Sequence, residues 1–261
     1  MSRTLAVHSW GAEGSPRVVC LHGVTSHGRH FTQLAERLAP RFHVQALDLL
    51  GHGDSPWEPP WNVRAQVEAV LATVGEEPAA YVGHSFGGRV AFELAAARPE
   101  CVERLVLLDP AILILPAAGL YAAENGRPDR SYASFEEGID RRYEESRLQS
   151  APRELLEREL AVHLVPSDDG RWRYRYCQSA VVAAYGEMSD DPPGFEQVEA
   201  PTLVLLGDHS YLPYDHLLED HRAALGDRLG VLRLDAGHTL LWDAADETID
   251  AVERFLELRG V

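Results

Sequence analysis

Short apolar runs alternate with stretches of helical periodicity along most of the chain, and this alternation restricts the fold more than any other feature. The runs are nearly continuous in apolar residues, which is typical of parallel strands covered on both faces. They occupy residues 17–23, 42–48, 79–84, 104–109, 201–208 and 230–238. The intervening stretches, with apolar residues three and four positions apart, are 30–39, 63–75, 87–99, 216–225 and 245–260. This order predicts an α/β fold with a doubly wound, mostly parallel sheet, and a further strand at 4–10 is expected at its N-terminal edge.

Residues 111–199 interrupt this alternation. Three stretches with helical patterns, joined by turns rich in glycine, proline and aspartate, lie at 135–146, 152–165 and 174–188. We therefore predict a core formed by residues 1–110 and 200–261, with 111–199 as a helical insertion between two of its strands.

The composition argues against several classes of partner. The 261 residues include 24 basic and 41 acidic ones, for a formal net charge of −17, so the chain repels nucleic acids and anionic membranes. No apolar run reaches the roughly 18 residues that a membrane span requires, and the N-terminal residues do not resemble a signal peptide. We expect a cytoplasmic protein. Its three cysteines, Cys20, Cys101 and Cys177, suggest neither a disulfide framework nor a metal site.

Ser85 lies in the sequence Gly-His-Ser-Phe-Gly, between a predicted strand and a predicted helix. A serine in such a sharp strand-to-helix turn has strained backbone angles, and small neighbours avoid a clash. The turn raises the serine hydroxyl above the sheet, where it can act as a nucleophile. The backbone N–H of Phe86 then faces the same space, near the positive end of the helix.

A second donor is expected from the loop that follows the strand at 17–23. The backbone N–H of Val24 is the candidate, and together with that of Phe86 it would form an oxyanion hole for a tetrahedral intermediate. His22, which precedes this loop, is expected to form structural hydrogen bonds.

His238 follows the last predicted strand and precedes the final helix. A neutral imidazole at this place can accept the proton of Ser85 and later donate it to the leaving group. His84 is next to the serine, but we expect it to point elsewhere and to support the pocket. Other histidines are expected at the surface or at a pocket rim, namely His27, His30, His52, His163 and His209. No histidine–carboxylate spacing indicates a metal site.

The chain resembles the α/β-hydrolase fold family. The resemblance rests on "LHG" (21–23), "DLLGHGDSP" (48–56), "GHSFGG" (83–88) and "DAGHTLLWDAADE" (235–247). It implies that the insertion follows the sixth strand and forms a cap over the active site. It also implies the chain order serine, acid, histidine for the catalytic residues. Asp54 and Ser55, in the second of these segments, are expected to be structural.

The acid that orients His238 is the least certain catalytic residue. In most members of the family it follows the seventh strand, a few residues after a glycine. In the corresponding loop here, 207–213, Ser210 and Tyr211 occupy the usual places, and Asp208 is the nearest carboxylate. The sequence therefore departs from the family pattern at this point.

Asp109, at the tip of the predicted strand 104–109, is the preferred acid. Some branches of the family, such as certain haloalkane dehalogenases and zearalenone lactonases, use a carboxylate at this place. An aspartate before a proline is also a common turn former, so a structural role remains an alternative. Asp208 is the second candidate, and Asp215 is a third.

With serine as the nucleophile, the expected reaction is acyl transfer followed by hydrolysis of the acyl-enzyme. The substrate is expected to be a small or medium carboxylic ester, bound without a cofactor, since no glycine-rich dinucleotide motif follows a strand. The alternative bonds for the same catalytic residues are lactones, thioesters and carbon–carbon bonds beside a carbonyl. A perhydrolase or haloperoxidase side activity is also compatible with such a site. The alternative from another class is a non-catalytic ligand-binding protein. Arginines in "GRWRYRYC" (170–177) are expected to be solvated or paired with acidic residues, and contact with a substrate carboxylate is the alternative.

Overall fold

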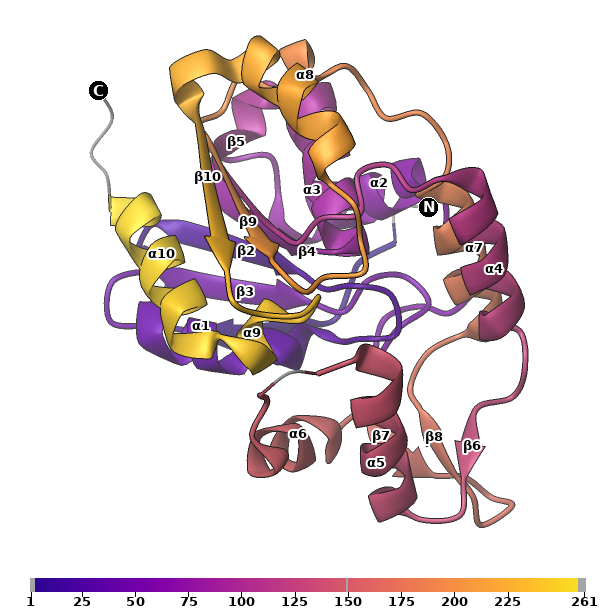
Figure 1. Ribbon diagram of the computed structural model, residues 1–261. Helices are drawn as coiled ribbons and strands as arrows, with labels where there is room; N and C mark the ends of the chain where they lie inside the picture. Colours follow the sequence, from indigo (N-terminus) through magenta and orange to yellow (C-terminus); the bar gives the residue numbers. More distant parts are fainter. Residues whose placement is uncertain (1–2, 149, 258–261) are drawn as a thin grey trace.

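The computed structural model describes residues 3–148 and 150–257. Its main sheet has seven strands in the order β1-β3-β2-β4-β5-β9-β10 (Figure 1). These strands are β1 (Val7–Trp10), β2 (Arg17–Leu21), β3 (His43–Leu47), β4 (Ala79–His84), β5 (Val102–Leu108), β9 (Thr202–Gly207) and β10 (Leu229–Leu234). β1 pairs antiparallel with β3 at one edge, and the other pairs in this sheet are parallel. The predicted α/β fold class and the predicted N-terminal edge strand are therefore confirmed.

Helices cover both faces of this sheet, which explains why its strands are apolar almost throughout (Figure 1). The helices on one face are α1 (Thr32–Leu38), α9 (Leu240–Asp243) and α10 (Ala245–Glu257), and those on the other are α2 (Val63–Val74), α3 (Phe86–Ala97) and α8 (Asp215–Leu225). Successive strand residues face opposite layers: Val18 and Cys20 pack with α1 and α10, whereas Val19 and Leu21 pack with α2 and α3. The sheet thus separates two hydrophobic cores.

Residues 111–199 lie between β5 and β9 and contain both helices and strands. These elements are α4 (Pro116–Gly126), β6 (Ser131–Tyr132), α5 (Phe135–Ser146), α6 (Arg153–Leu160), β7 (Leu164–Pro166), β8 (Trp172–Tyr174) and α7 (Gln178–Glu187). β6, β8 and β7 form a small antiparallel sheet. We refer to residues 111–199 as the insertion.

Three predictions for this part of the fold are wrong. The helix predicted over 152–165 ends at Leu160, and the one predicted over 174–188 begins at Gln178. The end of the first range and the start of the second belong to β7 and β8 of the small sheet. Strands of two or three residues carry too little periodicity to be recognised, and pairing with distant segments stabilises them. The insertion follows β5, the fifth strand in chain order and not the sixth, because only β1 precedes β2.

Two smaller features complete the fold. The predicted final helix, 245–260, is observed as α10 up to Glu257, and its last residues lie outside the described part. In the described ranges, no helix combines the length and the apolar character that crossing a membrane requires.

Candidate active site

Ser85 lies on the turn between β4 and α3 with φ of +52° and ψ of −117°, a backbone conformation that L-residues rarely adopt. The glycines on either side permit this turn. A Cβ at Gly83 would collide with the backbone of Gly87, and a Cβ at Gly87 would collide with the carbonyl of Leu21. The sequence-predicted turn is thus present, and its strain is held by close packing of β4, α3 and β2.

The two predicted oxyanion donors lie on either side of the serine. Phe86 is the first residue of α3, so its N–H has no acceptor within the helix. Gly23 packs directly against Ser85, since a Cβ added to Gly23 would be 3.0 Å from the Ser85 Cβ. Val24 follows Gly23 and lines the same cavity as Ser85. The structure therefore brings both backbone segments to the nucleophile candidate.

Asp109 directly follows β5 and contacts His238 across 129 residues of sequence. Its Oδ2 lies 2.6 Å from His238 Nδ1, and both side chains are buried. The backbone N–H of Gly207 donates to Asp109 Oδ1 at 3.0 Å, and the hydroxyl of Ser210 donates to Oδ2. Asp109 is therefore held by three hydrogen bonds, with its φ at +40°.

The alternative acids lie elsewhere. Asp208 is half-exposed and forms an ion pair with Arg233 at 3.7 Å. Asp215 is exposed and pairs with the same arginine. Neither carboxylate contacts His238 in the described structure. Ser210 occupies the place where an acid is usual in the family, and its hydroxyl donates a hydrogen bond to Asp109. The serine at this place was the sequence signal that could have revealed its contact with the acid.

His84 contacts both the backbone and the ring of His238. Its Nε2 donates to the backbone carbonyl of His238 at 3.0 Å, and the two imidazole rings are 4.8 Å apart. Burial, followed by the nearby charge of His238, holds the pKa of His84 well below its usual value, so this side chain is neutral. His84 also lines the cavity, in line with the expectation that it supports the pocket.

The other histidines differ from the prediction in part. His209 is exposed and contacts Asp235, and His30 lines the cavity. His27, His52 and His163, however, are buried outside the cavity lining, so their prediction as surface or rim residues is wrong. The insertion covers them: the His163 ring, from the insertion, stacks on His27 at 4.4 Å. Such burial depends on contacts between distant segments, which local polarity does not reveal.

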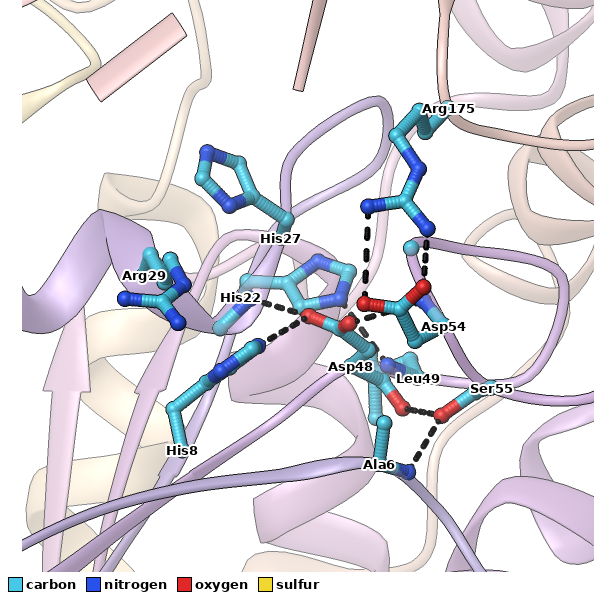
Figure 2. A network of polar contacts seen from close by, with 12 residues as sticks. Ala6, His8, His22, His27, Arg29, Asp48, Leu49, Asp54, Ser55 and Arg175 are labelled. Carbon is cyan, nitrogen blue, oxygen red and sulfur yellow. Dashed lines mark hydrogen bonds and ion pairs between the residues drawn. The ribbon is translucent and has the colours of Figure 1, made fainter. Parts of the chain in front are cut away.

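A buried carboxylate, Asp48, organises the loops beneath the site (Figure 2). It accepts hydrogen bonds from the backbone N–H groups of Gly28 at 2.7 Å and Asp54 at 3.0 Å, and from His8 Nε2 at 3.3 Å. Burial alone would raise the pKa of Asp48, but the hydrogen bond from His8, the neighbouring His22 and the two N–H groups lower it overall. Asp48 therefore anchors the chain on both sides of β3 as a carboxylate.

His22, Asp54 and Ser55 belong to this network, in line with their expected structural roles. His22 Nε2 accepts the N–H of Leu49 at 2.9 Å, and burial lowers the pKa of His22 to about 3. Ser55 bridges Ala6 and the Asp48 carbonyl. Asp54 forms an ion pair with Arg175 of the insertion (Figure 2).

A cavity of about 490 Å³ opens above Ser85 and His238. The core contributes the loops after β2, β4, β9 and β10, and the insertion contributes residues of α4, α5 and α7. Apolar and aromatic side chains of the insertion that line it are Ile114, Leu115, Tyr121, Tyr176, Val181, Tyr185 and Met188. The lining is largely apolar with a few polar groups, as in sites for small organic molecules.

The arginines of residues 170–177 do not line this cavity. Arg173 forms ion pairs with Asp129 and Asp169 at 2.8 Å, and Arg175 pairs with Asp54. The prediction that these arginines pair with acidic residues is confirmed for Arg173 and Arg175, whereas the side chain of Arg171 donates to Ser131. Within the described ranges, no three histidine, cysteine, aspartate or glutamate residues are grouped so that they could hold a metal ion.

Comparisons with known proteins agree with this architecture. The sequence model of the Alpha/beta hydrolase family matches residues 18–251, so the chain belongs to this family. It is 39% identical over 247 residues to Lipase LipV of Mycobacterium tuberculosis, covering 90% of each chain. It is also 28% identical to an sn-1-specific diacylglycerol lipase of Mus musculus, covering 92% of this chain and 81% of the relative.

The fold also matches solved structures. A crystal structure of E-2-(acetamidomethylene)succinate hydrolase superposes with a TM-score of 0.85, covering 97% of this chain and 95% of the other, at 23% identity. At this level of identity, the match shows the shared fold.

Proposed function

We propose that this protein is a serine hydrolase that cleaves small or medium carboxylic esters through an acyl-enzyme on Ser85. The observation that carries the proposal is the 2.6 Å contact between Asp109 and His238 beside the strained turn of Ser85. The similarity to lipases over most of the chain supports the ester as the bond that is cleaved.

Each residue has a role in this mechanism. Asp109 accepts a hydrogen bond from the Nδ1–H of His238. The other ring nitrogen, Nε2, then carries a lone pair that can accept a proton. Nε2 takes the proton of Ser85 as the hydroxyl attacks the ester carbonyl, and then gives it to the leaving alcohol. The N–H groups of Val24 and Phe86 stabilise the oxyanion. Water, activated by the same histidine, then hydrolyses the acyl-enzyme.

The cavity supports the expected substrate size. Its volume of about 490 Å³ falls in the range of small-molecule sites and holds an ester of short or medium acyl length. Apolar side chains from the insertion would surround the acyl or alcohol part.

The test is hydrolysis of p-nitrophenyl acetate, butyrate, octanoate and palmitate by the wild-type protein and by Ser85→Ala. We expect kcat/KM to be highest between acetate and octanoate and low for palmitate. Ser85→Ala should lower kcat by about 10,000-fold or more. Equal rates for both proteins would contradict the proposal.

A fluorophosphonate label on Ser85 separates the remaining outcomes. Labelling without ester hydrolysis would support Ser85 as the nucleophile but indicate that the bond cleaved is in a lactone, in a thioester or between two carbon atoms. A folded protein that neither labels nor hydrolyses would favour a ligand-binding role.

A further inference from the structure

Arg142 is a buried cation in the wall of the cavity. It lies on α5, and its side chain is 8% exposed. Its Nη1 donates to the Thr25 hydroxyl at 3.3 Å and its Nη2 to the Thr25 carbonyl at 3.2 Å. The buried Nε–H has no hydrogen-bond partner. Nη1 and Nη2 each carry a second hydrogen beyond their bonds to Thr25, and these are the donors that the guanidinium can offer to a group in the cavity.

This charge has no direct ion-pair partner among the described residues. Burial disfavours it, but the neighbouring groups, Tyr174 and Tyr176 first and then Glu145 and Glu159, raise the pKa of Arg142 overall. The guanidinium lies 5.2 Å from the Tyr174 ring and 5.5 Å from the Trp242 ring. Another buried arginine, Arg89, is satisfied differently: it pairs with Glu93 at 2.8 Å and donates to several carbonyls. Aromatic faces attract a cation but do not neutralise it, and a buried charge without a partner is costly.

Arginines outnumber carboxylates in the lining of the cavity around Arg142. Among the described residues, the cavity lining contains the arginines Arg130, Arg142 and Arg147 and a single carboxylate, Glu145. Arg130 and Glu145 pair with each other at 2.8 Å. Arg147 places its guanidinium 5.8 Å from the Tyr211 ring, next to His238. The cavity is therefore a positive region in a chain whose net charge is −17.

We propose that Arg142 binds a free carboxylate of the substrate, and that the preferred substrates are half-esters of dicarboxylic acids. The ester end would lie at Ser85 and the carboxylate at α5. A planar guanidinium with two donors on one edge matches a carboxylate, and the low dielectric of the cavity strengthens the pair. The ester part of this inference rests on the proposed function, whereas the carboxylate site does not.

The contacts with Thr25 suggest a purely structural role as the alternative. Thr25 follows Val24, has a φ of +64°, and also accepts a hydrogen bond from His163 Nε2 at 3.1 Å. Loss of Arg142 could disturb this loop and slow the hydrolysis of every ester. A substrate-binding role, by contrast, requires a loss that depends on the charge of the substrate.

The kinetic test compares 4-nitrophenyl hydrogen adipate, which is an anion, with its neutral methyl ester. We expect the wild type to prefer the anion by about tenfold or more in kcat/KM. Arg142→Met should bring this ratio close to one, and Arg142→Lys should retain part of the preference. Arg141→Met is the matched control, because Arg141 is an exposed neighbour that pairs with Glu144; its ratio should equal that of the wild type.

Two kinetic results would overturn the proposal. One is a wild type without preference for the anion. The other is an equal loss for both substrates in Arg142→Met, which would assign Arg142 to the support of the Thr25 loop. If Arg142→Met does not fold, the test uses the ratio of kcat/KM for the anionic and the neutral ester in the wild type and in Arg142→Lys.

A binding test keeps the inference separate from the proposed function. Titration calorimetry with adipate on Ser85→Ala should give binding that weakens by about tenfold or more when Arg142→Met is added. Adipate binding without ester hydrolysis would reject the proposed function and support the carboxylate site. Ester hydrolysis without adipate binding or anion preference would reject the carboxylate site alone.

Discussion

The core and the insertion contribute to the cavity in different ways. In the core, Ser85, Asp109 and His238 all follow strands of the main sheet, where neighbouring backbone holds each of them. In the insertion, residues such as Arg142 lie on helices, which bring charged and aromatic side chains into the lining of the same cavity. The difference teaches that the sheet positions the proposed catalytic groups, whereas the insertion contributes much of the shape and charge of the cavity above them.

Both apolar packing and hydrogen bonds join these two regions. Ile112, Ala184 and Met188 of the insertion belong to one of the hydrophobic clusters of the core. Glu159 on α6 accepts hydrogen bonds from His30 Nδ1 at 2.9 Å and from Trp242 Nε1 at 2.5 Å. Arg142 and His163 of the insertion both donate to the carbonyl of Thr25 in the core. The insertion therefore contacts the loops that carry the site, and changes in either region can be compared through their effects on kcat, KM and stability.

The largest expected effect lies in the core. Asp109→Asn should lower kcat by about 1,000- to 10,000-fold, because an amide facing Nδ1 no longer favours the reactive tautomer or stabilises the imidazolium. Asp208→Asn is the matched control and should stay within about twofold of wild type, since the half-exposed Asp208 pairs with Arg233 and forms no hydrogen bond or ion pair with His238 in the described structure. Rates for p-nitrophenyl butyrate measure both. An inactive Asp208→Asn variant together with an active Asp109→Asn variant would contradict Asp109 as the acid and assign Asp208 instead.

An intermediate effect is expected when acid protonates the histidines buried in the core loops. Burial lowers the pKa of His22 to about 3 and that of His52 to about 4, from an ordinary value of 6.5. The unfolded chain therefore binds more protons below pH 6.5, and stability present above that pH is lost as the pH falls toward 4. Each of these histidines should remove about 1 kcal/mol from the free energy of unfolding for each pH unit in this window.

Urea denaturation between about pH 7 and about pH 5 measures this loss, in a range above the ordinary pKa of carboxylates. A free energy of unfolding that stays constant over this interval would show that the histidines are not neutral in the folded protein.

The smallest expected effect lies at the contact between the regions. Glu159→Gln keeps the shape but exchanges one acceptor oxygen for a donor, which leaves His30 or Trp242 without its partner. We expect a loss of about 1–3 kcal/mol in stability, with a higher KM and little change in kcat. Glu157→Gln is the control, because Glu157 lies on the same helix and pairs with exposed Arg153. Equal stability of both variants would indicate that Glu159 does not join the two regions.

Much of the core could be predicted from the sequence because its signals are local. The near-continuous apolar runs identified the strands, and the glycines around Ser85 identified the sharp turn at the end of β4. The position of His238, after the last strand and before the final helices, was equally readable. These patterns depend on residues within a few positions of one another, where sterics and periodicity act directly.

The tertiary structure decided what depends on contacts between distant segments. Both Asp109 and Asp208 follow strands, and only the packing of β5 beside β9 shows that Asp109 faces His238. The small sheet of the insertion exists because β6 and β7 both pair with β8. The burial of Arg142 beside Thr25, 117 residues away, likewise has no local signature. The sequence alone thus determined the elements and the candidate nucleophile and base, whereas long-range packing determined the partner of the base and the charge of the cavity.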